Sequence, residues 1–233
     1  MFKNRIEDTD PGEKAGFSEL VLTFIKEHKF VVFMAVVLVA AIIIISVQMS
    51  VTSKYDAFIM YTGPTYAASS SIYGNVIEGA SEILSTDENE VDVAFSTLVY
   101  VSPELADYYM QEGIEYNGAY NAESVQSFDY ALAAGEYCIL IIDTTLYEDT
   151  KHLDVFVPLA ELGIPTDAAH DEYALKLKEL GIYKLDGFCE LNEDSVVVLR
   201  KKSFIQSLFA NKKKTEARYN AQREYFIKLV EFN

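Results

Sequence analysis

The chain has 233 residues, of which 50% are hydrophobic, and its formal net charge at pH 7 is −17. This acidic balance argues against nucleic acid as a partner, because nucleic-acid-binding domains present basic surfaces to the phosphate backbone. The two cysteines are not spaced as a CxxC pair, which excludes a zinc or redox motif of that type.

Residues 1–29 form a cytoplasmic tail in the predicted organisation. Apolar side chains recur there at helical spacing, namely Phe17, Leu20, Val21, Phe24 and Ile25. This stripe predicts a short amphipathic helix that lies on the inner leaflet or packs against a helix of another membrane protein. A helix that simply continues into the next segment explains the same pattern.

Residues 30–49, FVVFMAVVLVAAIIIISVQM, predict a transmembrane helix and therefore the lipid bilayer as a partner. Ser46 and Gln48 are the only polar side chains in this run. Twenty residues at 1.5 Å per residue give about 30 Å, which is the thickness of the hydrocarbon core of a bilayer. A cleavable signal peptide fits poorly, because its apolar region is shorter and starts closer to the N-terminus.

The flanks of this segment predict its orientation. Five Lys and Arg side chains precede it, whereas Lys54 is the only one between the segment and Lys151. Basic residues near a span favour the cytoplasmic side. We therefore expect a single-pass protein of the cell membrane, with a linker at 50–54 and one extracytoplasmic domain at 55–233.

Strands and helices alternate in the first half of this domain. The predicted strands are 56–63 (DAFIMYTG), 91–101 (VDVAFSTLVYV) and 137–143 (YCILIID). The predicted helices are an amphipathic run from Ile72 to Leu84, then 102–113 with Ser102 as N-cap and Pro103 at the first helical position, and then 122–135 closed by Gly135. The segment 115–121 reads as a loop. This alternation predicts an α/β domain with a mainly parallel sheet flanked by helices, in which the apolar strand 137–143 is central.

The second half is less regular. Residues 152–165 show short strand and turn character, and 173–180 is compatible with a strand or a short helix. Residues 195–202 (SVVVLRKK) predict a strand. A last helix is expected from about 215 to 231, with Ala221, Tyr225, Phe226 and Leu229 as its buried stripe.

Hydroxyl and carboxyl side chains follow the three predicted strands of the first half. They are Thr62, Tyr66, Ser69, Ser70, Ser71, Ser102, Asp143, Thr144 and Thr145. Ligands of open parallel sheets bind outside the carboxyl ends of the strands, so these residues are the candidate ligand-binding set. N-capping of the helices explains the same residues without a ligand. Since no Lys, Arg or His occurs from Tyr55 to Thr150, any ligand here is expected to be neutral or cationic.

Metal, disulfide and catalytic signals are weak. The acidic run Asp87–Asp92 lacks the glycine of an EF-hand loop and is read as a polar turn rather than a calcium site. Cys138 lies in an apolar strand, which favours a buried thiol over a disulfide with Cys189. Because common catalytic and cofactor motifs such as GxSxG, HExxH and GxGxxG are missing, neither a cofactor nor a set of catalytic residues is predicted.

The segments KYDAFIMYTGP, AGEYCILIIDTTLYE, FVPLAELG and DSVVVLRKKS together carry a resemblance that covers roughly residues 54–203. In these segments the chain resembles uncharacterised single-span proteins of Gram-positive bacteria, whose external domain is similar to one lobe of a type 2 periplasmic solute-binding protein. The resemblance implies a binding-protein-like fold and not an enzyme. The chain is too short for two such lobes.

The sequence therefore predicts a membrane-tethered, non-catalytic module that binds or scaffolds a protein partner or a small polar ligand, neutral or cationic. The alternative is a cell-surface hydrolase acting on wall polymer or glycan, for which the many external acids provide material but no distinguished pair.

Overall fold

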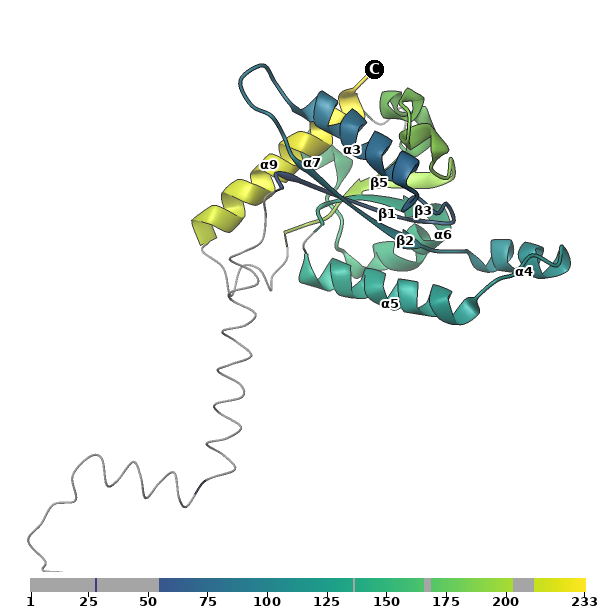
Figure 1. The fold of residues 1–233 in the computed structure, drawn as a ribbon. Coiled ribbons are helices and arrows are strands. Elements are labelled where there is room, and N and C mark those ends of the chain that lie inside the picture. Colours follow the sequence, from purple (N-terminus) through teal and green to yellow (C-terminus); the bar gives the residue numbers. More distant parts are fainter. Residues whose placement is uncertain (1–27, 29–54, 136, 166–168, 203–211) are drawn as a thin grey trace, which may run out of the picture. The chain divides into compact units, whose positions relative to one another are not determined.

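The computed structural model describes residues 28, 55–135, 137–165, 169–202 and 212–233 (Figure 1). The predicted tail apart from His28, the membrane span at 30–49 and the linker at 50–54 lie outside these residues, and the membrane anchor stays a prediction. Within the described part, no helix combines the length and the hydropathy that crossing a bilayer requires.

Five strands form one sheet in the order β2-β1-β3-β5-β4. They are β1 (Ala57–Gly63), β2 (Val93–Val99), β3 (Ile139–Asp143), β4 (Ala174–Lys176) and β5 (Ser195–Leu199). β1 pairs in parallel with β2 and β3, whereas β5 is antiparallel to β3 and β4. The predicted α/β class with helices around a sheet is confirmed, but the sheet is mixed rather than mainly parallel. β4 and β5 are joined by turns, and a connection without a crossover pairs neighbouring strands antiparallel.

Three apolar strands, β1, β3 and β5, lie inside the sheet. Every residue of these strands is buried, and β3 is the third of the five strands, as its uninterrupted apolar sequence predicts. The β1 side chains alternate between the two faces, so that Ile59 and Tyr61 join one core and Met60 joins the other.

One face of the sheet is covered by α3 (Ser70–Leu84) and α9 (Lys212–Glu231), as Figure 1 shows. Val76, Ala80 and Leu84 are buried from α3, at the spacing that predicted the helix. Phe226 and Leu229 are buried from α9. Three 3-10 turns, Leu177–Glu179, Gly181–Lys184 and Phe188–Glu190, contribute Leu177, Ile182 and Phe188 to the same core.

The opposite face is covered by α5 (Gly118–Ala134) and α6 (Thr144–Thr150). The predicted loop at 115–121 is wrong in its second half, because α5 already starts at Gly118. The side chain of Asn117 accepts a hydrogen bond from the Tyr120 N–H and caps this earlier start. Gly135 ends α5 in the left-handed conformation, as expected for a helix C-cap glycine.

The remaining elements are short. α4 (Pro103–Gln111) begins as predicted, with the Ser102 hydroxyl accepting from the Leu105 N–H at 3.3 Å. A 3-10 turn (Lys151–Leu153) follows α6, and α7 (Leu159–Leu162) precedes β4. The ambiguous segment 173–180 is a three-residue strand followed by a 3-10 turn.

Both cysteines are free thiols; Cys138 is buried, as favoured above, and Cys189 is exposed. The acidic run begins in an exposed turn, in which Thr86 and Asn89 exchange backbone hydrogen bonds, in line with the predicted turn between helix and strand.

Candidate functional site

The carboxyl ends of β1 and β3 mark a reversal in the winding of the sheet. The chain moves from β1 to β2 on one side and later enters β3 on the other side of β1. Such a reversal leaves a crevice outside the strand ends, where ligands of open α/β sheets bind. The first candidate site therefore lies between the ends of β1 and β3.

The segment before β5 closes this crevice by internal hydrogen bonds. The Asn192 side chain donates to Asp143 Oδ2 at 3.1 Å, and the Asn192 backbone N–H donates to the Tyr61 hydroxyl at 3.4 Å. The Thr144 N–H and hydroxyl both donate to the Asp194 carbonyl. Because β5 is antiparallel, its preceding loop arrives at this edge and fills space that a parallel strand leaves open.

Most of the nine predicted ligand-binding residues lie around this edge in different roles. Ser102 and Asp143 cap α4 and α6, and Asp143 accepts from the Thr145 N–H at 2.9 Å. Tyr66 is 65% exposed, Ser71 is exposed, and Ser69 precedes α3 without a side-chain capping bond. Ser70 is the first residue of α3, and its side chain is outside the description. Helix capping thus explains two of the nine residues, Ser102 and Asp143. A ligand-binding role for the nine residues stays a prediction.

Burial raises the pKa of Asp143, and hydrogen bonds from Thr145, Leu146 and Asn192 oppose that rise without cancelling it. Only 7% of this residue is exposed, so in this conformation its carboxylate serves Asn192 and Thr145 rather than an outside ligand.

Thr62 is the unusual member of the set. It is fully buried on β1, and its hydroxyl has no hydrogen-bond partner among the described residues. Thr62 shares its strand face with Met60 and therefore points to the α5 side, away from Asp143 and Tyr61. A buried hydroxyl without a partner costs free energy, since it has lost its water.

Replacing Thr62 with valine is expected to leave the free energy of unfolding unchanged or to raise it by about 1 kcal/mol, because the isostere removes an unpaired hydroxyl. Thr150→Val is the matched control. Its buried hydroxyl donates to the Leu146 carbonyl at 2.8 Å, so this change is expected to cost about 1 kcal/mol. Urea unfolding of the full chain in detergent micelles, followed by circular dichroism, measures both. An equal loss in both variants contradicts an unpaired Thr62.

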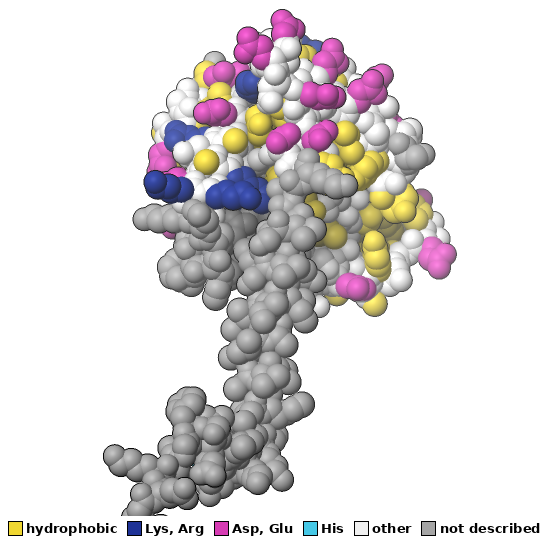
Figure 2. Space-filling model, turned by 60° about the vertical axis from the view of Figure 1, so that its left-hand side comes forward, with side chains coloured by type: hydrophobic (Ala, Val, Ile, Leu, Met, Phe, Trp, Pro, Cys, Tyr) yellow, Lys and Arg dark blue, Asp and Glu magenta, His cyan; other side chains and the backbone are white. Residues whose placement is uncertain are grey.

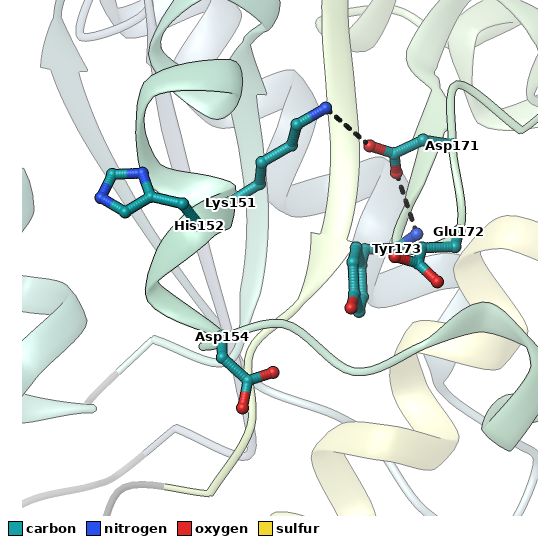
Figure 3. Close-up of a pocket in the computed structure, with 6 residues that line it drawn as sticks. All are labelled: Lys151, His152, Asp154, Asp171, Glu172 and Tyr173. Carbon is teal, nitrogen blue, oxygen red and sulfur yellow. Dashed lines mark hydrogen bonds and ion pairs between the residues drawn. The ribbon is translucent and has the colours of Figure 1, made fainter.

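A second candidate site lies at the other end of the strands. It is a hollow of about 640 Å³ lined by Lys151, His152, Asp154, Asp171, Glu172 and Tyr173, which we call the amino-edge hollow (Figure 3). β5 ends beside the start of β3, where Leu199 pairs with Ile139, and Lys201 just beyond it contacts Asp154 at 2.5 Å. The hollow therefore lies at the amino ends of β3 and β4.

A network of charged and polar groups holds one wall of this hollow. The Tyr147 hydroxyl donates to both oxygens of Asp171, at 2.7 and 2.8 Å. The Lys151 ammonium contacts Asp171 at 3.4 Å and Glu148 at 2.7 Å, and His170 Nε2 lies 2.8 Å from the other Glu148 oxygen. Figure 3 shows the Lys151 side chain reaching toward Asp171, with the His152 ring turned away from it.

The electrostatics of the network follow from these contacts. Burial raises the pKa of Asp171, but the Tyr147 hydroxyl, the Tyr173 N–H and Lys151 outweigh it and hold the pKa below its usual value. Lys151 and His170 lower the pKa of Glu148, and the same pairing with Glu148 raises the pKa of Lys151. Both carboxylates are therefore ionised at neutral pH and attract cations.

The sequence prediction missed the amino-edge hollow. Glu148 and Lys151 are three residues apart at the end of a helix, a spacing typical of a solvated surface pair. Their partners lie about twenty residues later, in a tight turn where the His170 N–H bonds to the Ala174 carbonyl. The only usable signal was the pair His170–Asp171 just before a strand, which by itself is not specific.

Comparisons with protein-family models, with curated proteins and with solved structures found no match for this chain.

Proposed function

We propose that the chain is a membrane-tethered, extracytoplasmic binding module whose amino-edge hollow holds a small polar ligand with a cationic group. In this proposal residues 30–49 anchor the chain and the domain corresponds to one lobe of a solute-binding protein. The amphipathic helix predicted around Phe17–Ile25 remains a candidate contact for another membrane protein.

The observation that carries the proposal is the chemistry of the hollow. Its lining places three carboxylates and a phenol around a volume in the range of small-molecule sites. Asp154 and Asp171 each contact one lysine ammonium through an exposed or half-buried ion pair. Such pairs are weak, so a cationic ligand can replace one of them at small cost.

The binding part of the proposal is tested with the full chain in lipid nanodiscs. We expect putrescine, a dication, to raise the melting temperature, and succinate to have no effect. A ligand at about 100 times its Kd stabilises the folded state by about 2.7 kcal/mol, which corresponds to about 5–10 °C for a domain of this size.

A matched pair of variants assigns any effect to the hollow. Glu172→Gln removes one lining carboxylate, whereas Glu82→Gln makes the same change on the exposed side of α3, across the sheet. The shift with putrescine should shrink in the first variant only. Equal shifts in both variants, or no shift with putrescine, would overturn the binding site.

Topology is tested separately. Protease added to intact cells that express the chain should digest the part after residue 54 and spare the tail. Digestion of that part only after the cells are opened would overturn the extracytoplasmic placement, whatever the ligand result.

A further inference from the structure

Three side chains of the metal-ligating type converge beside the amino-edge hollow. They are Glu148 of α6 and the neighbouring pair His170 and Asp171, and one ligand atom from each lies within 4.8 Å of the others. Among the described residues, this is the one such group of three. Only Asp171 is shared with the lining of the hollow.

Two of the three groups are held in a fixed orientation. Asp171 Oδ1 accepts from the backbone N–H groups of Tyr173 and Ala174, at 2.9 and 3.1 Å, and the Tyr147 hydroxyl also donates to the carboxylate. The His170 ring stands edge-on against the Tyr147 ring, with centroids 5.8 Å apart. Hydrogen-bond partners outside the ligand set that orient a ligating carboxylate are a regular feature of metal sites.

A cation already occupies the space between the two carboxylates. The Lys151 ammonium lies 2.7 Å from Glu148 Oε2 and 3.4 Å from Asp171 Oδ2. More than a third of the Lys151 and Glu148 side chains is exposed, and an ion pair between such groups changes an equilibrium constant by about fivefold at most. A divalent ion that gains an imidazole nitrogen and two carboxylate oxygens at once should displace the ammonium.

We propose that Glu148, His170 and Asp171 bind a divalent transition-metal ion of the Zn²⁺ type, in competition with the Lys151 ammonium. Two carboxylates balance the charge of the ion, and the imidazole favours zinc over calcium or magnesium. Ligand atoms around zinc are separated by about 3.0–3.4 Å, given bonds of about 2.1 Å. The 2.8 Å between His170 Nε2 and Glu148 Oε1 needs to widen by only a few tenths of an ångström. Three protein ligands leave a coordination position for water or for a ligand in the hollow.

The test is a Zn²⁺ titration of the full chain in nanodiscs, by calorimetry and by competition with a chromophoric chelator. We expect one equivalent of Zn²⁺ in the native chain. Glu148→Gln and His170→Ala should weaken this binding at least tenfold, and Lys151→Met should strengthen it up to about fivefold, because the competing cation is gone. Asp171 is left unchanged, because it also holds the turn before β4.

His152→Ala is the matched control, since His152 lines the hollow but belongs to no ligand set. It should bind Zn²⁺ like the native chain. Zinc binding that is unchanged in both Glu148→Gln and His170→Ala would overturn the site, as would a Lys151→Met variant that binds no zinc. Because Glu148 and His170 do not line the hollow, this failure would leave the putrescine result untouched, and the two proposals are separable.

Discussion

A Gly187→Ala variant is expected to lose about 3 kcal/mol or more of unfolding free energy. Gly187 has φ of +83° and ψ of −50°, a sparsely populated conformation that costs an L-amino acid about 1–3 kcal/mol. A Cβ at this position would lie 2.6 Å from the Val76 nitrogen and 2.8 Å from the Asn75 Cβ. The first of these atoms belongs to the backbone of α3 and cannot rotate away, and overpacking of this kind adds about 1–3 kcal/mol.

Gly163→Ala is the matched control for this prediction. Its φ of +72° and ψ of +18° lie in the ordinary left-handed region, a milder conformation for alanine than that of Gly187, and the space around the new Cβ is open to 4 Å. Gly163→Ala should lower the unfolding free energy only by the cost of placing alanine in the left-handed conformation, about 1–2 kcal/mol. Urea unfolding of the full chain in micelles measures both variants. If Gly163→Ala and Gly187→Ala lose the same free energy, α3 does not pack against the 3-10 turns as closely as described.

Local sequence patterns predicted the elements whose signals lie within a few residues. The apolar run 137–143 identified the central strand, and the Ser102–Pro103 pair identified the start of α4. The predicted buried stripe of α9 is confirmed for Phe226 and Leu229, whereas Ala221 and Tyr225 are only half-buried. In each case the residues that form the element also carry its signal.

The arrangement of these elements depends on contacts between distant residues, which a local pattern does not contain. Gln222 of α9 is an example. Its side chain accepts from the Phe58 N–H at 2.9 Å and donates to the Asp56 carbonyl. These two backbone groups precede Ile59, the first β1 residue that pairs with β3, and the glutamine side chain supplies their hydrogen bonds. Nothing in residues 56–58 indicates that a glutamine 164 residues later will supply this bond.

The candidate sites show the same division. The carboxyl edge was predictable, because strand ends follow from the strands. Its closure by Asn192 was not, because that depends on the reversed direction of β5. The amino-edge hollow combines a helix end with a turn some twenty residues later in the chain. In the sequence alone, each group of charged residues is therefore read as part of a solvated surface.

Arg200→Met is expected to lower the unfolding free energy by about 3 kcal/mol, although methionine keeps most of the volume and removes a buried charge. The Arg200 residue is 3% exposed, and its guanidinium donates to the carbonyls of Leu132, Gly135 and Tyr137 at 3.2, 3.0 and 3.3 Å. These carbonyls lie at and just beyond the C-terminus of α5, where helix carbonyls lack intrahelical partners and the helix dipole favours a cation.

The sign of this effect follows from what the substitution leaves behind. Exchanging a buried ion pair for apolar residues is often neutral, because both partners are removed together. Here the acceptors are backbone carbonyls and stay in place. Each buried carbonyl that loses its donor costs about 1–3 kcal/mol. Burying an apolar methionine instead of a charged arginine offsets only part of the total cost for these carbonyls.

Arg223→Met separates this effect from the loss of any arginine. The Arg223 guanidinium also donates to a backbone carbonyl, that of Glu161 at 2.5 Å, but at an exposed site where water can replace it. Arg223→Met should therefore change the unfolding free energy by no more than about 0.5 kcal/mol. Hydrogen exchange of the last turn of α5 should accelerate in Arg200→Met and not in Arg223→Met, because only Arg200 holds that turn to the end of β5. Equal stability of the two variants would mean that water reaches the α5 carbonyls, and that Arg200 fills space there rather than pairing with them.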